Sequence, residues 1–595
     1  MKTQNKNRLY IGLGNSPHDP AIAIVNSSGQ LLFAEASERY LQNKRAWGCP
    51  ADDMVRAGKL LNEYADKDTE LVLASSWSDS FIGKARFMCF TPGFSNLMKA
   101  TIPENIYSLL TLLLSIWHRR SGANLEYQAI RKNTQSKIIR KTFNHHLCHA
   151  AAACYSSPFS EAVCAVIDGH GENSSTSFYH YKDGDLKKLA IKRSDVGSLG
   201  FYYMQVCLAC GFDPIKGEEW KVMGLAPYGK FNEEIAKLLR KIITVDDGVI
   251  KIIEDYKILH QATQFIRKDG ESPLKAADFA FTAQHYFTEL YCKLLSKLYS
   301  LKLSENLVLT GGCALNSAAN GLLHHHVPFK ESFIFSAPAD DGNAVGAAWL
   351  AYKDDNLRIP VSNSIQSPYL GSEIKSSSVD KYEKFGRIKR TATNNKKICD
   401  YAAELLAEGN IIGWVQGRAE FGPRALGNRS ILADPRSPNV KEKINENVKF
   451  REGFRPFAPS ILHEFGDQYF KDYRETPYME RALFFKKNVI QKVPGVAHVD
   501  GTGRLQTVKR EWNLMYYDLI HSFYNLTGVP IVLNTSFNVM GKPIIHSVED
   551  AFTVFFSSGL DALVINERIY LKKDVIESKP WGDKDKHELS IASAA

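Results

Sequence analysis

Two histidines four residues apart give the sequence its clearest potential for chemistry. In NHHLCHAAAA, the spacing of His145 and His149 places both rings on one face of a helix, where they could chelate one metal ion. Asp168 ends an apolar run in VIDGHG and Asp340 lies in PADDGNAVGAA, so both carboxylates belong to loops at strand ends. Two imidazoles and two carboxylates suit Fe(II), Mn(II) or Zn(II), and Asp341 competes with Asp340 for the fourth place. An isolated pair of this spacing is also typical of ordinary buried histidines, so the prediction depends on the two carboxylates.

Basic residues in the second half of the chain are not arranged as a solvated helical face. They lie in GRAEFGPRALGNRS, KEKINENVKFREGFRPFAPS and HVDGTGRLQTV, where glycine, proline and aromatic residues interrupt them. Guanidinium groups on loops shaped by glycine suit phosphoryl or carboxylate oxygens, which they bind in pairs. The basic residues of interest are Arg418, Arg424, Arg429, Lys443, Lys449, Arg451, Arg455 and Arg504. The NTSFN loop from Asn534 adds amide and hydroxyl donors, or is an ordinary turn.

A glycine pair, Gly311 and Gly312, separates a predicted strand at 306–310 from a predicted helix that starts at Ala314. Free backbone N–H groups at such a helix start attract a phosphate or lie against a nucleotide. The string TGGCALN is neither a Rossmann nor a P-loop pattern, and a tight strand-to-helix turn is the alternative.

The elements that must position these residues form a weak internal repeat. Strands separated by polar turns are predicted at 10–13, 21–25 and 30–38, and the pattern returns at 163–167, 177–181 and 186–191. This predicts a duplicated α/β domain with its site between the halves. Between 359 and 397 the chain becomes polar and rich in Ser and Lys, and we place a linker there. The predicted domains are 1–360 and 396–595, joined by a linker at 361–395.

The composition excludes several classes of protein. A chain of 595 residues with 44% hydrophobic and 23% charged residues is neither disordered nor fibrous, and its net charge of +9 is too small for a dedicated nucleic-acid binder. The N-terminus lacks the pattern of a signal peptide, and the ten cysteines lie mostly in apolar runs, so we expect a reducing, cytoplasmic setting. The apolar stretch at 106–117 is too short to span a membrane, which favours a buried or interfacial helix.

Together these strings resemble the O-carbamoyltransferase family that includes the nodulation-factor and tobramycin carbamoyltransferases. The resemblance rests on SPHDPAIAIV, ASERYLQNK, NHHLCHAAAA, VIDGHGE, KVMGLAPYG, LTGGCALNS, DDGNAVGAA, GRAEFGPRALGNRS, KFREGFRPFAPS, HVDGTGRLQ and NTSFNVMGKPI, which cover nearly the whole chain in order. It implies an α/β protein with an N-terminal duplicated actin-like ATPase (Kae-like) domain and a C-terminal α/β YrdC-like domain.

The resemblance also implies a two-step reaction. Carbamoyl phosphate and ATP would form carbamoyl adenylate in the C-terminal domain, and the N-terminal domain would pass the carbamoyl group to an acceptor hydroxyl. Mg is a candidate cofactor that would accompany ATP.

The resemblance assigns roles to individual residues. The implied anion clamps are Arg418, Lys443, Lys449, Arg451 and Arg504, and Asn534 and Ser536 would hold nucleotide or carbamoyl. The implied ligands of Fe(II), or of another divalent metal, are His145, His149, Asp168 and Asp340. Adenosine would contact Gly311, Gly312 and Asn316. His18 would be the general base, and Lys44 would stabilise the oxyanion or the phosphate. Pro17 and Pro20 flank His18 where this family more often has small polar residues, a departure that affects the acceptor site.

The leading hypothesis is therefore an ATP-dependent O-carbamoyltransferase acting on a hydroxyl of a small natural product, such as a saxitoxin-type toxin or an antibiotic. We expect a monomer or homodimer without nucleic-acid or membrane partners. The alternative is a threonylcarbamoyl-adenosine tRNA modification enzyme built from the same domain types, against which the modest charge and the lack of an RNA module argue. A hydrogenase-maturation carbamoyltransferase would carry paired CxxC zinc modules, which the sequence lacks. A non-catalytic, ligand-sensing protein is the remaining class.

Overall fold

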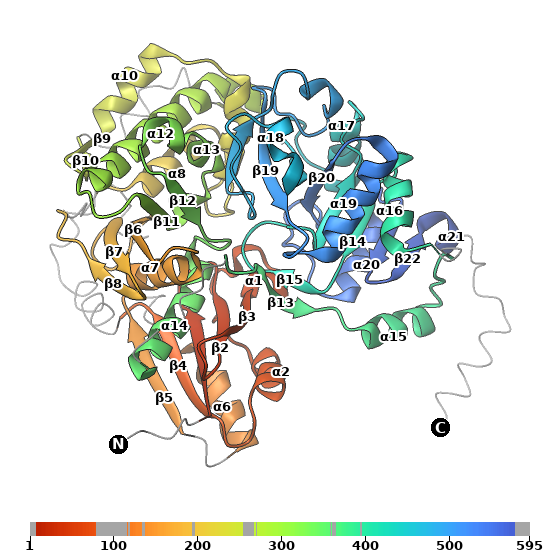
Figure 1. Ribbon diagram of the computed structural model, residues 1–595, viewed down its shortest axis with the longest axis horizontal. Coiled ribbons are helices and arrows are strands. Elements are labelled where there is room, and N and C mark those ends of the chain that lie inside the picture. The colour runs from red at the N-terminus through yellow and green to blue at the C-terminus, as the bar shows by residue number, and fades with distance from the viewer. Residues whose placement is uncertain are drawn as a thin grey trace.

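The structure is a computed structural model of the full chain (Figure 1). It describes residues 7–78, 116, 120–133, 137–192, 197–253, 267–268, 270–356, 359, 365–392 and 396–576. The chain is α/β, as predicted, with two five-stranded sheets in its first half and one eight-stranded sheet in its second.

The two five-stranded sheets have the same topology. The first has the order β3-β2-β1-β4-β5 and the second β8-β7-β6-β11-β12; in each, the first three strands are antiparallel and the last two join in parallel. The strands of the first sheet are β1 (Arg8–Gly14), β2 (Ala21–Val25), β3 (Leu31–Ala36), β4 (Glu70–Ser76) and β5 (Ile138–Phe143). Those of the second are β6 (Glu161–Ile167), β7 (Thr176–Lys182), β8 (Asp185–Lys188), β11 (Asn306–Thr310) and β12 (Glu331–Ile334). The predicted duplication of the first half is confirmed.

Two helices rich in small residues pack between these sheets. They are α7 (His145–Ser156, HHLCHAAAACYS) and α14 (Asn343–Asn356). A Cβ on Gly12 of β1 would lie 1.7 Å from the carbonyl oxygen of Ala344, so the helix approaches the strand as closely as backbones allow. This close packing brings the N-terminal ends of both helices to the same place between the two halves.

The first half contains further helices within the described residues. They are α1 (Ser37–Leu41), α2 (Met54–Tyr64), α6 (Ala123–Lys132), α8 (Leu199–Ala209), α9 (Trp220–Leu225), α10 (Glu233–Ile242), α12 (Ala277–Ser300) and α13 (Ser317–His326). The helix predicted from Ala314 corresponds, after one 3-10 turn, to α13. A two-stranded hairpin, β9 (Ile243–Asp246) and β10 (Val249–Ile252), completes this half.

The second half is built on one sheet of order β18-β19-β17-β20-β16-β14-β21-β22. Its strands are β14 (Ile412–Val415), β16 (Arg429–Ala433), β17 (Ala458–Leu462), β18 (Arg481–Phe484), β19 (Thr502–Val508), β20 (Ile531–Ser536), β21 (Ala562–Ile565) and β22 (Arg568–Leu571). Its helices are α16 (Ile398–Ala407), α17 (Val440–Ile444), α18 (Gly466–Tyr469), α19 (Leu514–Thr527), α20 (Val548–Ser557) and α21 (Lys572–Ile576). Fully buried Trp414 of β14 and Tyr516 of α19 belong to its core.

The polar segment predicted as a linker is more ordered than the sequence suggested. It contains β13 (Tyr369–Glu373), which pairs with β15 (Arg418–Glu420), and helix α15 (Ser376–Gly386). Its single buried apolar helix position, Val379, explains why hydrophobic periodicity failed to reveal the helix.

Direct contacts hold the two halves together. Asn320 of α13 donates from Nδ2 to the carbonyl oxygen of Glu480 at 2.9 Å, and Arg481 of β18 donates to Ser332 Oγ at 3.1 Å. Any cavity between the halves therefore has fixed walls.

Two expectations concern the setting of the chain. None of the helices in the described ranges has both the length and the apolar character needed to cross a bilayer; the stretch at 106–117, apart from Ile116, lies outside these ranges. The nine cysteines within the described residues are free.

Candidate active site

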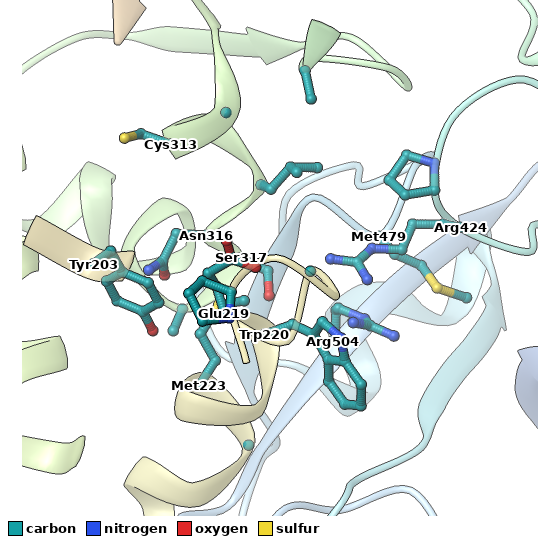
Figure 2. Close-up of a pocket in the computed structure, with 18 of the residues that line it drawn as sticks. Tyr203, Glu219, Trp220, Met223, Cys313, Asn316, Ser317, Arg424, Met479 and Arg504 are labelled. Carbon is teal, nitrogen blue, oxygen red and sulfur yellow. The ribbon is translucent and has the colours of Figure 1, made fainter. Parts of the chain in front are cut away.

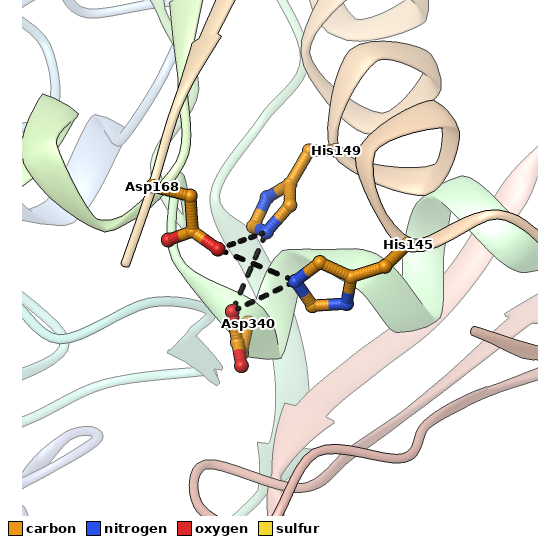
Figure 3. A group of neighbouring side chains, drawn as sticks. All are labelled: His145, His149, Asp168 and Asp340. Carbon is orange, nitrogen blue, oxygen red and sulfur yellow. Dashed lines mark hydrogen bonds and ion pairs between the residues drawn. The ribbon is translucent and has the colours of Figure 1, made fainter. Parts of the chain in front are cut away.

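Four side chains converge where α7, β6 and α14 meet (Figure 3). His145 Nε2 lies 3.4 Å from Asp168 Oδ2 and 3.5 Å from Asp340 Oδ1, and His149 Nε2 lies 3.8 and 3.4 Å from the same two oxygens. All four residues are buried. Four donors around an ion at about 2.1 Å would be roughly 3.0–3.5 Å apart, so the group is close to the size of a divalent-metal site. The structure thus brings together all four predicted ligands.

Local structure fixes each of these donors. Asn144 caps α7 by accepting the N–H of Leu147 at 3.1 Å, and the following helical turns place both histidines on one face. Asp168 follows β6, and its Oδ1 accepts the backbone N–H of Gly312 at 2.8 Å. Because Oδ1 is held in this way, Oδ2 faces the histidines.

The electrostatics also fit a bound cation. Burial alone would lower the pKa of His145, but Asp340 and Asp168 outweigh it and raise the pKa to about 10. Burial would raise the pKa of Asp168 and of Asp340, yet the histidines hold both well below the usual range. Two buried carboxylates therefore require positive charge here, which a divalent ion would supply.

Asn343 provides a further test of this fit. Its Oδ1 is buried without a partner, while its Nδ2 lies 3.2 Å from both His145 Nδ1 and His149 Nε2. Because His145 Nδ1 faces this amide, His145 Nε2, the nitrogen near both carboxylates, is left for a metal. The residues present fit a divalent ion.

Asp341, the competing ligand, lies outside this group. Its Oδ1 accepts the N–H of Gly342 at 3.1 Å, and burial together with Asp19 and Glu38 raises its pKa to about 8. Asp340 is the carboxylate that faces the histidines.

A cavity of about 1680 Å³ extends from this group into the second half of the chain (Figure 2). Asp168 and Asp340 line it at one end, with Gly312 and Asn316 of the glycine turn beside them. The second half contributes the cations Arg424, Lys449, Arg451, Arg455 and Arg504. Two of the four predicted metal ligands and three of the five predicted anion clamps thus line one cavity.

Two of the cations in this cavity, Arg424 and Arg504, have no carboxylate in the described part of the chain that offsets their charge. Burial lowers the pKa of Arg424 to about 10, and burial with Arg424 and Arg451 lowers that of Arg504 further. No described carboxylate counteracts either shift. Arg451 has its pKa lowered to about 9 by burial and Arg455, although Glu452 partly compensates. A buried positive cluster of this kind is costly unless it receives an anion.

Lys449 is held by the loop that follows β20. Its Nζ lies 2.7 Å from Asn538 Oδ1, 3.0 Å from Asn538 O and also against Ser536 O. Asn534 at the end of β20 directs Nδ2 to Gln506 Oε1 at 2.9 Å, and its own Oδ1 is buried without a partner. Asn534 and Ser536 both line the cavity, as expected for residues that meet a ligand there.

Two predicted clamp residues lie elsewhere, and the expectation for them is corrected. Arg418 donates to the carbonyl oxygens of Gly371, Leu370 and Leu32, so it joins β15 to β13 and to the first half of the chain. Lys443 of α17 is exposed and donates to Gly409 O at 3.3 Å. Sequence reasoning could not separate them from cavity residues, because a motif does not show which way a side chain points.

Arg424 and Arg455, which are not among the predicted clamp residues, do line the cavity. Arg455 lies over the ring of Trp220 at 4.6 Å and pairs with Glu452. The signal for Arg424 was its position in FGPRALG, where glycines bracket a short loop. Gly311, in contrast, does not line the cavity but shapes the turn with a φ of 91°.

His18 and Lys44 line the cavity on the side of the first half. His18 Nδ1 lies 2.8 Å from Asp19 Oδ2, a carboxylate that also accepts from Arg45 at 3.1 Å. When Nδ1 carries the proton toward Asp19, Nε2 is the basic nitrogen of the ring. Glu219 lies on the same side, and burial is the main cause that raises its pKa.

The family models for the carbamoyltransferase N-terminus and C-terminus match residues 10–349 and 403–572. These matches show that the chain belongs to the carbamoyltransferase family and is an enzyme that transfers carbamoyl groups.

Several known proteins are similar to this chain. An uncharacterized protein of Synechocystis sp. is 34% identical over 98% of this chain and 99% of its own. The nodulation protein NolNO of Sinorhizobium fredii is 36% identical over 74% of this chain and 65% of its own, and NolO of Bradyrhizobium diazoefficiens is 35% identical over 72% and 79%. Among solved structures, component A of the Acidaminococcus fermentans 2-hydroxyglutaryl-CoA dehydratase aligns with 58% of this chain and 99% of its own, at 11% identity and a TM-score of 0.31.

Proposed function

We propose that the protein is an ATP-dependent O-carbamoyltransferase that forms carbamoyl adenylate from carbamoyl phosphate and ATP and then carbamoylates a hydroxyl of a small natural product. The observation that carries this proposal is one cavity that joins a cationic end, where Arg424 and Arg504 have no matching carboxylate, to the His/Asp group and His18. This arrangement suits two steps with a labile intermediate, because the intermediate can pass from one end of the cavity to the other without release from the protein.

The first step belongs at the cationic end. There carbamoyl phosphate, ATP and one water give carbamoyl adenylate, pyrophosphate and phosphate. Arg424, Lys449, Arg451 and Arg504 bind the phosphoryl oxygens, and their mutual repulsion in the free protein is relieved when these anions arrive. Magnesium would accompany ATP.

The second step belongs at the other end. The acceptor oxygen bonds to the carbamoyl carbon, the bond to the adenylate phosphate oxygen breaks, and AMP leaves. His18 Nε2 takes the hydroxyl proton while Asp19 holds the ring, and Lys44 lies nearby to oppose negative charge on the oxygen. A divalent ion such as Fe(II), held by His145, His149, Asp168 and Asp340, would supply Lewis acidity for carbonyl or phosphate oxygens.

The acceptor side of the cavity is acidic and aromatic. Glu38, Glu219 and Asp341 line it together with Trp47 and Trp220. Burial is the main cause that raises the pKa of all three carboxyl groups, and a cationic acceptor would offset that cost and lie against the indole faces. The acceptor would then carry an ammonium or guanidinium group, which fits a saxitoxin-type toxin or a basic antibiotic. We place the reaction in the cytoplasm, where ATP and carbamoyl phosphate are available.

Mass spectrometry of reactions with ATP, carbamoyl phosphate and a panel of hydroxylated metabolites tests this proposal. The panel should pair each cationic alcohol with a neutral analogue of similar size. The expected product is the cationic alcohol with one hydroxyl proton replaced by a carbamoyl group. Carbamoylation of the neutral members alone would contradict the acceptor class, and no dependence on carbamoyl phosphate would contradict the reaction.

A further inference from the structure

Helix α1 lies next to β13 and β15, where the first half of the chain meets the second (Figure 1). Its consecutive residues Glu38 and Arg39 contact different parts of the chain: Glu38 contacts the loop near His18, and Arg39 contacts the second half. Glu38 Oε2 accepts the backbone N–H of Arg45 at 2.8 Å, and Arg45 O in turn accepts the N–H of Asp19 at 2.8 Å, next to His18. Glu38 therefore supports the loop that carries the general base.

Arg39 reaches into the second half instead. Its Nη2 donates to Gly422 O at 2.8 Å, and its Nη1 lies 3.6 Å from Glu420 Oε2. The exposed fractions of these two side chains are 2% and 0%, so the ion pair is screened from water. In the described part of the chain, no other side-chain cation lies within ion-pairing distance of Glu420.

Glu420 organises the loop that carries Arg424. Its Oε1 accepts three backbone N–H groups, from Leu426 at 2.7 Å, Asn428 at 2.9 Å and Arg429 at 3.1 Å. The loop is therefore wrapped around one buried carboxylate, and Arg39 supplies that carboxylate's counter-charge.

Glycines at both ends of the loop limit where it can move. Gly422 and Gly427 have φ values of 111° and 104°, and a Cβ at either would lie 2.2 Å from its nearest neighbour, Ser336 O or Tyr516 Cδ1. Between them, Arg424 lines the cavity beside Arg504 (Figure 2). The direction in which the Arg424 side chain points therefore depends on the carboxylate of Glu420, which holds the loop backbone, and on Arg39.

We propose that Arg39 is a positioning residue that holds Arg424 against the anion while its neighbour Glu38 holds the His18 loop, so that one helix aligns the anion-binding and acceptor sides of the cavity. The inference rests on the proposed function in taking the anion to be a phosphoryl group. Arg39 itself touches neither substrate. A lysine cannot reproduce its action, because it lacks the forked donors that reach Gly422 O and Glu420 together.

Calorimetric binding of inorganic pyrophosphate to the full-length protein tests the inference. We expect Arg39→Gln to weaken binding about tenfold and Arg39→Lys to restore little of it. In an Arg424→Ala background the same Arg39→Gln change should alter the affinity less than twofold, because the residue through which Arg39 acts is gone. Arg56→Gln is the matched control, since Arg56 is equally buried and pairs with Glu35 at 3.1 Å without touching the loop.

The outcomes separate the inference from the proposed function. An undiminished effect of Arg39→Gln in the Arg424→Ala background, or an equal loss in Arg56→Gln, would overturn the positioning role. Hydrogen exchange keeps the test decisive if the variants lose stability. Arg39→Gln should speed amide exchange at Leu426, Asn428 and Arg429 more than at the remaining residues of β16, 430–433. Equal acceleration at all these amides would count against the positioning role. If the wild type binds pyrophosphate with this pattern but shows no exchange between ATP and pyrophosphate that depends on carbamoyl phosphate, the proposed function is wrong and the positioning role stands.

Discussion

Asp168 connects the glycine turn to the histidines: its Oδ1 accepts the N–H of Gly312 at 2.8 Å, and its Oδ2 lies 3.4 Å from His145 Nε2. Asp168 thus links the glycine turn at Gly312, which borders the cavity, directly to the His/Asp group that suits a metal. A ligand seated on the turn would contact backbone already fixed by that carboxylate.

Loss of one histidine should remove metal without unfolding the chain. We expect His149→Ala to lower the affinity for divalent metal at least about 100-fold, because three donors remain for a site built from four. Metal content after dialysis and calorimetry measure this. His146→Gln is the control: His146 lies on the same helix but pairs with Ser177, so its variant should keep the metal. Equal loss in both variants would contradict the ligand set.

Removal of an uncompensated cation should stabilise the protein while abolishing anion binding. We expect Arg504→Met to raise the free energy of unfolding by about 1–3 kcal/mol, since a buried charge repelled by Arg424 and Arg451 is replaced by an apolar chain. Denaturant unfolding and pyrophosphate calorimetry measure the two effects. A destabilised variant that still binds pyrophosphate would show that Arg504 has a structural partner instead.

Anion binding should take up protons. Burial and the two arginines 451 and 455 lower the pKa of Lys449 well below 10.5, and a bound anion would raise it again. Affinity for pyrophosphate should therefore weaken as the pH rises from that lowered pKa toward 10.5. Calorimetry in buffers of different ionisation enthalpy should detect proton uptake in the wild type and less in Lys449→Met. Equal uptake in both proteins would exclude Lys449 as its source.

Acid should weaken the contact between the two halves. Burial would raise the pKa of Glu35, but His546 and Arg56 hold it well below its usual 4.5, and Ser372 donates to it at 3.0 Å. A carboxyl with a lowered folded pKa stabilises the protein above about pH 4.5 and loses this contribution as the pH falls toward the folded pKa.

We expect Glu35→Gln to cost about 1–3 kcal/mol of stability at pH 7 and progressively less as the pH falls below 4.5. Thermal unfolding across this range measures the change. Glu567 is exposed, so the control variant Glu567→Gln should leave the pH dependence of thermal unfolding unaltered. A constant deficit in Glu35→Gln at every pH would show that ionisation of Glu35 is not its cause.

The sequence allowed the chemistry to be predicted better than the geometry. Motif spacing led to the four His/Asp residues and the duplicated hairpins, because strand ends and helix faces follow directly from local patterns. It could not show that Arg418 turns toward backbone carbonyls while Arg424, six residues later, faces the cavity, since that depends on tertiary packing. Helix α15 was missed for a similar reason: it buries one apolar residue and so lacks a hydrophobic period.

Exchange between ATP and labelled pyrophosphate in the presence of carbamoyl phosphate, measured on His18→Asn, tests the central claim most directly. The account predicts that this variant keeps wild-type exchange while losing carbamoyl transfer, and that Arg504→Ala loses exchange, because activation and transfer use opposite ends of one cavity. Loss of exchange in His18→Asn, or its absence in the wild type, would contradict this division of labour.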